Sequence, residues 1–336
     1  PVGIMNNMPS TINISHKTVL FVIFSLLFFW FIYQISDILV MFFISVIIAA
    51  AMNPGVDRLN KLGVPRSLAI FLVYIVVWGV IGGLIASIVP GLLDQTKKLI
   101  RVLPSAVSQI DFFSAHQQEI AQQVLSRVGE LPQNILKLVV GLFGNIINVL
   151  TVLAMSFYLL LERDRLDKFV SATLAESSRS KANQVIAEME NSLGSWVRGE
   201  LVLMFVVGLL TYIGLIFLGL DIALPLAILA GFLEIVPNVG PIISSIPSVL
   251  VALTIHPLTA AATASWYFLV QFLENNLLVP KIMQKAVGVH PLISLLGLMI
   301  GFRLGGPVGA ILALPLIVTL RIIIRHYLAP FRTLSL

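Results

Sequence analysis

Charged side chains occur inside long apolar stretches of this sequence, where a lipid bilayer makes a charge costly. They are Glu234 in the run Glu-Ile-Val-Pro-Asn-Val-Gly-Pro241, Glu274 in Glu-Asn-Asn276, and Arg303 just before Gly305-Gly306-Pro307. A charge at the bilayer centre costs about 2.5–3.5 kcal/mol on insertion scales, so such groups face a cavity or one another. We therefore expect a binding site in which Glu234 holds a proton or a cation. The alternatives are that Glu234 pairs with Arg303 or lies at the membrane interface.

The residues that follow Glu234 interrupt a helix. Pro237 and Pro241 each remove a backbone hydrogen bond, which costs about 3 kcal/mol in a helix interior. Asn238 and Gly240 stand between the prolines and favour a turn. Lipid offers the backbone no hydrogen-bond partner, so a break at bilayer depth persists only where it packs in protein or lines a polar cavity. The sequence thus predicts a membrane-buried polar break.

The polar run at Glu274 has two interpretations. Asn275 supplies an amide that suits either an ion or a sugar-like hydroxyl, which favours a site. The run also lies near the predicted cytoplasmic end of its helix, where polar side chains can cap the helix or meet headgroups. The candidate substrate- or ion-binding residues are Glu234, Pro237, Asn238, Gly240, Pro241, Glu274, Asn275, Arg303, Gly306 and Pro307.

The C-terminal half contains a structural pattern twice. Residues 239–247 and 305–315 each combine a Gly-Pro break with an apolar arm that carries a second proline. A long helix precedes each hairpin, so one helix-plus-hairpin unit crosses the bilayer an odd number of times and the second copy must be inverted. Inverted repeats with broken helices at the binding site are typical of secondary transporters. The alternative is a set of kinked core helices without a transport role.

Composition identifies the class of protein that carries these breaks. Of 336 residues, 58% are hydrophobic and 11% are charged, against roughly 25% charged in soluble proteins. We therefore predict an all-α, polytopic membrane protein. The predicted helices lie at about 18–36, 37–52, 67–92, 134–161 and 201–218, followed by a proline-rich segment to 255, a helix at about 258–278 and an interrupted stretch at 290–326.

Five regions follow from these elements. They are membrane helices at 15–93, an outer amphipathic helical region at 94–133, a membrane helix plus a cytoplasmic interfacial helix at 134–200, repeat 1 at 201–257 and repeat 2 at 258–327. Most Lys and Arg fall on one side when both termini are cytoplasmic, as the positive-inside rule requires. The outer region is either a cap or a subunit contact. Trp196, Arg198 and Glu200 suit an interfacial collar before the membrane crossing at 201.

The sequence argues against catalysis. It has no Cys, no H-E-x-x-H motif and no phosphate-binding loop in a suitable setting. We expect no enzyme activity, no metal site and no cofactor. The net charge of +5 is explained by the loops and needs no nucleic-acid partner. The expected partners are the lipid bilayer and a small polar solute or a monovalent cation or proton.

The same residues resemble those of a known family. Glu234-x-x-Pro237-Asn238-x-Gly240-Pro241, Glu274-Asn275 with Pro280-Lys281, His290-Pro291, and Gly305-Gly306-Pro307 with Gly309 and Pro315 are similar to motifs of the autoinducer-2 exporter family. This resemblance implies a transporter of the bacterial inner membrane. It also implies export of the quorum-sensing signal autoinducer-2 or, in other members, exchange of sodium or lithium for protons. Homo-oligomeric assembly, including a pentamer, and an elevator-like mobile unit are further implications.

We therefore expect a secondary transporter that exports a small polar solute such as autoinducer-2, coupled to a proton or cation. A sodium(lithium)/proton antiporter is the first alternative. A non-transporting membrane scaffold or a channel is the second.

Overall fold

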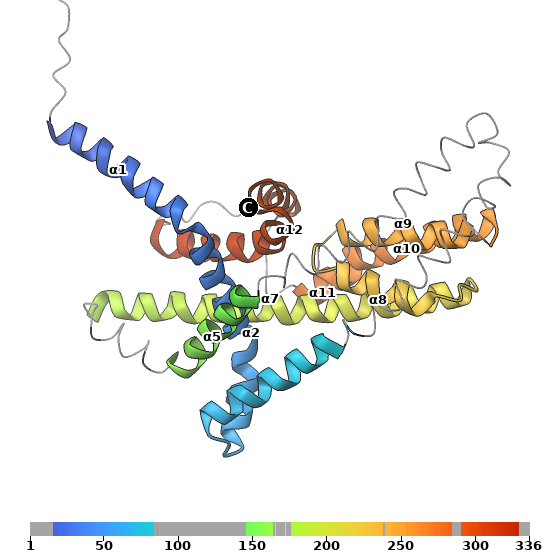
Figure 1. Ribbon diagram of the computed structural model, residues 1–336, viewed down its shortest axis with the longest axis horizontal. Coiled ribbons are helices and arrows are strands. Elements are labelled where there is room, and N and C mark those ends of the chain that lie inside the picture. The colour runs from blue at the N-terminus through green and yellow to red at the C-terminus, as the bar shows by residue number, and fades with distance from the viewer. Residues whose placement is uncertain are drawn as a thin grey trace, which may run out of the picture. The chain divides into compact units, whose positions relative to one another are not determined.

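The computed structural model describes residues 16–83, 86, 146–163, 165, 172, 176–237, 239–253, 255–283 and 290–328, and every regular element in them is helical (Figure 1). Five helices are long and apolar enough to cross a membrane. The prediction of an all-α, multi-pass membrane protein is thus confirmed. The outer region at 94–133 and Asn238 lie outside the described residues. The labelled elements are α1 (His16–Gln34), α2 (Ser36–Lys61), α5 (Ile146–Leu161), α7 (Glu176–Phe217), α8 (Ala223–Leu233), α9 (Val239–Leu253), α10 (Pro257–Leu273), η2 (Glu274–Leu278), α11 (Val279–Met283), α12 (Pro291–Ile323) and η3 (Ile324–Leu328).

The chain divides into two compact units. The first ends at Phe43 and the second begins at Ile44, within α2. The first unit holds α1, which has no buried residue and exposes Leu, Ile, Val and Phe side chains along its length. That exposure is typical of a helix that faces lipid. All of the candidate site lies in the second unit.

The second unit is organised around α7, whose 42 residues extend over roughly 63 Å. The sequence predicts two separate helices here, an interfacial one to about 196 and a membrane one from 201. The structure joins them, because the segment between them contains no proline and Gly199 stays helical. Figure 1 shows α8 and α10 beside the C-terminal half of this helix.

The first hairpin consists of α8 and α9, joined by a turn at 234–237. Glycines allow the close approach on both sides of α8. A Cβ on Gly231 would lie 2.5 Å from the Met204 carbonyl oxygen of α7, and one on Gly240 would lie 2.0 Å from the Leu233 oxygen. The 11 residues of α8 span only about 16 Å, against a hydrocarbon core of about 30 Å.

The second hairpin is α12, which breaks where the sequence places its Gly-Gly-Pro run. Gly305 and Gly306 leave the helical conformation, and Gly306 has a φ of +59°. The two arms fold back on each other, since a Cβ on Gly309 would lie 2.0 Å from the Gly301 carbonyl oxygen. The hairpin also reaches the first one, because Val236 packs against Leu298, Ala310 and Ala313.

This hairpin gives a matched pair of glycine substitutions. Gly309→Ala is expected to destabilise the protein by about 1–3 kcal/mol, because the new methyl group forces the arms apart. Gly305→Ala is the control: a Cβ there meets nothing within 4 Å, and φ is −132°, which any residue adopts. Thermal unfolding of both variants in the same detergent measures the difference. Equal melting temperatures would show that the arms do not pack through Gly309.

Candidate functional site

Three carboxyl groups are buried together in the second unit. The exposed fractions of Glu200, Glu234 and Glu274 are 3%, 0% and 1%. They come from three elements: α7, the turn after α8, and the start of η2. Glu234 interacts electrostatically with both of the others, and Glu200 interacts with Glu274. The structure thus gathers these acids into one site, which we call the carboxylate cluster.

Glu234 occupies the position where α8 ends. Its backbone N–H donates to the Ala230 carbonyl oxygen at 3.1 Å, so the residue closes the last helical turn. The chain then turns through residues 235–237 before α9 begins. Neither side-chain oxygen of Glu234 has a hydrogen-bond partner within the described part of the chain. The break predicted from Pro237 and Pro241 therefore places a buried, unpaired carboxyl group at a helix end.

Glu274 lies at a second irregularity, the π-helical turn η2 that continues α10. A π turn widens the helix locally, and such turns are frequent at functional sites. Glu274 is buried in line with the inward face of α10 at 260, 263, 267 and 270, while Asn275 and Asn276 are exposed. Asn276 donates to the Phe272 carbonyl oxygen at 2.8 Å. Gln271 interacts with Glu274, and its side-chain amide has no partner with hydrogen-bond geometry among the described residues.

Glu200 is the member of the cluster that the sequence interpretation misplaced. The prediction of an interfacial collar is wrong for Glu200 and Trp196, both of which are buried, whereas Arg198 is exposed. Gly199 allows α7 to pass close to α11, since a Cβ there would lie 2.8 Å from the Met283 sulfur. The signal was available in the sequence. Buried positions recur on α7 with three- and four-residue spacing at 193, 196, 200, 203 and 207, and Glu200 belongs to that series.

The other predicted site residues divide by exposure. Gly240 and Pro241 are buried beside the turn, and Pro237 is half-buried. Arg303 and Pro307 are exposed, Gly306 is half-buried, and Asn275 is exposed. Arg303 makes no ion pair with Glu234, whose oxygens have no partner in the described residues, so the paired alternative does not hold in this structure. The second hairpin approaches Glu234 through its packed arms rather than through Gly306 and Pro307.

Among the described residues, no basic side chain pairs with the carboxylate cluster, and this determines which chemistry the cluster can perform. A buried carboxylate without a partner is strongly disfavoured, so such a group holds a proton or binds a cation. Across the described ranges, no group of three His, Cys, Asp or Glu residues is arranged to hold a metal ion. The arrangement suits reversible binding of protons or weakly held monovalent cations.

A hydrogen-bonded pair between α9 and α10 is an example of buried polar groups that do have hydrogen-bond partners. The Ser248 hydroxyl on α9 lies 2.7 Å from the Tyr267 hydroxyl on α10, and Ser248 also donates to the Ser244 carbonyl oxygen at 3.2 Å. On the other face of α10, Trp266 Nε1 donates to the Leu210 carbonyl oxygen of α7 at 3.1 Å. These bonds tie α9, α10 and α7 together, whereas among the described residues both side-chain oxygens of Glu200 and of Glu234 lack a partner with hydrogen-bond geometry.

Comparison with known proteins places this architecture in a family. The model of the "AI-2E family transporter" matches residues 19–329. YrrI of Bacillus subtilis (strain 168) is 26% identical over 89% of both chains, and YueF of the same strain is 30% identical over 85% of this chain and 83% of its own. PerM of Escherichia coli (strain K12) is 27% identical over 89% of this chain and 90% of its own. Their names give YrrI and YueF as candidate transport proteins and PerM as a candidate permease. The match over nearly the whole chain, together with its membrane helices, shows that this protein belongs to the AI-2E family of transporters and is not an enzyme.

Proposed function

We propose that the protein is a secondary transporter of the bacterial inner membrane whose carboxylate cluster carries the coupling ion. The observation that supports this most directly is the burial of Glu200, Glu234 and Glu274 together, with no basic partner among the residues that the structure describes. Keeping three such groups without a basic partner in the described part of the chain lowers stability, and a fold that retains them, two of them at helix irregularities, uses them for exchange of charge. The coupling ion is a proton or a monovalent cation.

The proposed cargo is a small polar solute such as autoinducer-2, exported against the inward flow of the coupling ion. The family supports this class of cargo. The second candidate is a sodium(lithium)/proton antiporter, which the cluster favours because a neutral solute alone would not require three acids. The third, a passive channel or scaffold, leaves the carboxyl groups without a role.

The proposed transport core consists of the units at 201–257 and 258–327, the second inverted relative to the first. In support, each unit contains a helix followed by a hairpin broken at glycine and proline. The shortness of α8 favours a hairpin that enters the membrane and returns on the same side. Both termini are placed in the cytoplasm, and assembly as a homo-oligomer with an elevator-like mobile core completes the proposal.

Reconstituted protein tests this function. Proteoliposomes with an imposed pH gradient and an internal pH-sensitive dye are to be supplied with autoinducer-2, sodium or lithium. Gradient-dependent flux of autoinducer-2 with no dye response to cations is the expected result. A dye response to sodium or lithium alone would instead establish the antiporter. Sustained conductance in a planar bilayer would contradict both carriers, because alternating access is far slower than a channel.

A further inference from the structure

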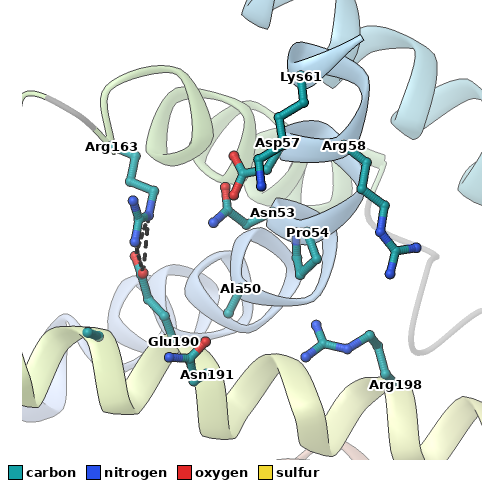
Figure 2. A pocket seen from close by; sticks show the side chains of 11 residues that line it. Ala50, Asn53, Pro54, Asp57, Arg58, Lys61, Arg163, Glu190, Asn191 and Arg198 are labelled. Atoms are coloured by element: carbon teal, nitrogen blue, oxygen red, sulfur yellow. Dashed lines mark hydrogen bonds and ion pairs between the residues drawn. The ribbon is translucent and has the colours of Figure 1, made fainter.

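A polar cavity separate from the carboxylate cluster lies where the end of α2 meets the first half of α7 (Figure 2). Its volume is about 360 Å³. The last three turns of α2 supply one wall, α7 supplies another, and Arg163 reaches in after α5. The two helices meet closely because Gly194 has no side chain: a Cβ there would lie 2.4 Å from the Ala50 carbonyl oxygen.

The cavity has an excess of positive charge. Its lining includes Arg58, Lys61, Arg163 and Arg198 against Asp57 and Glu190. Both acids have partners, since Glu190 accepts from Arg163 at 2.5 Å and Asp57 lies 3.5 Å from Arg66. Within the described ranges, Arg58, Lys61 and Arg198 form no ion pair. The charge of these three cations is therefore not balanced by an ion pair within the part of the chain that the structure describes.

The geometry brings two of these cations to one place. Figure 2 shows the guanidinium groups of Arg58 and Arg198 facing the space between α2 and α7 from opposite sides. Among the described residues Arg198 donates to the Ser195 hydroxyl at 3.1 Å on its own helix and to no other side chain, so most of its donors are available there. Asn53 and Asn191 line the same cavity on the side of the Arg163–Glu190 pair (Figure 2). Like charges held together in this way are stabilised by an anion between them.

We infer that this cavity binds a phosphate-bearing anion, held between Arg58 and Arg198. Guanidinium forks match phosphate oxygens in geometry as well as in charge. Two sources share that chemistry, a phospholipid headgroup and a soluble phosphate. The lipid is favoured by position, because the lining residues of α2 directly follow its apolar, membrane-crossing part. The inference does not depend on the transported cargo or the coupling ion.

Binding to the purified full chain tests the site. Native mass spectrometry measures retention of phosphatidylglycerol against phosphatidylcholine, and isothermal titration in detergent measures inorganic phosphate. The variants are Arg58→Gln, Arg198→Gln and the two combined. The control is Arg165→Gln combined with Lys281→Gln, which removes the same charge from exposed positions outside the cavity.

The combined cavity variant is expected to weaken binding of the responsible probe by about tenfold or more, while the control stays within about twofold. Loss for phosphatidylglycerol alone identifies a lipid site, and loss for inorganic phosphate identifies a soluble ligand. If the combined variant does not fold, each single variant should still show a reduction. Failure of both probes to bind, or equal losses in the cavity and control variants, would overturn the inference.

Discussion

Replacing Glu234 by Gln is expected to reduce coupled transport in proteoliposomes to the rate of protein-free vesicles. The amide keeps the size and shape of the carboxyl group but neither releases a proton nor carries a negative charge. Glu234 is fully buried at the end of α8 and interacts with both other acids of the cluster. Those two acids lie on other elements, so neither can take over the role of Glu234 in the turn. The measurement is initial flux under an imposed pH gradient, at matched protein density.

Two further variants make the Glu234→Gln result specific. Glu162→Gln is the matched control. Glu162 is partly exposed, and among the described residues its ion pair is with Arg165 one turn away at 2.8 Å. Transport by this variant should therefore be unchanged. Glu234→Asp retains an acid on a shorter side chain and should keep measurable but slower flux. Wild-type flux in Glu234→Gln, with a normal elution profile, would remove this residue from the coupling mechanism.

Local signals in the sequence were sufficient to locate most of the elements around the site. Pro237 and the Gly305-Gly306 pair interrupt helices through their own backbone properties, and Pro241 lies in the first turn of α9, where a proline is tolerated, so both breaks can be predicted without tertiary information. The helix at 258–278 is present as α10 continued by η2. The inward direction of Glu274 follows from the helical spacing of the buried positions 260, 263, 267 and 270 on α10, whereas the π turn after it has no residue signature of its own.

The sequence could not show which charged residues face each other. Arg303 and Glu234 both occur at helix breaks, yet one is exposed and the other fully buried, because the second hairpin presents its packed arms to the first. Glu200 was assigned to the interface because its neighbours Trp196 and Arg198 suit that setting. Its burial follows from its place on the buried face of α7, so the helical spacing carried that signal, and only its proximity to Glu234 and Glu274 on other elements has no local pattern.

The structure also predicts that two buried polar residues respond in opposite ways to apolar substitution. Glu200→Met is expected to raise the free energy of unfolding by about 1–2 kcal/mol, because both oxygens of Glu200 lack partners and Met fills a similar volume without the desolvation penalty. The same variant should lose coupled transport. Ser248→Ala is expected to lower the free energy of unfolding by about 1–3 kcal/mol, because it leaves the Tyr267 hydroxyl buried without this partner.

Reversible unfolding in mixed micelles of rising SDS content measures both changes on the same scale. A carboxyl group that only supports the fold would make Glu200→Met less stable, as Ser248→Ala is. A more stable but inactive Glu200→Met would show that the acid is retained for exchange of charge at a cost in stability, which is the behaviour expected of a coupling site. A less stable variant with normal transport would remove Glu200 from the carboxylate cluster as a functional group and leave Glu234 and Glu274 to carry the coupling ion.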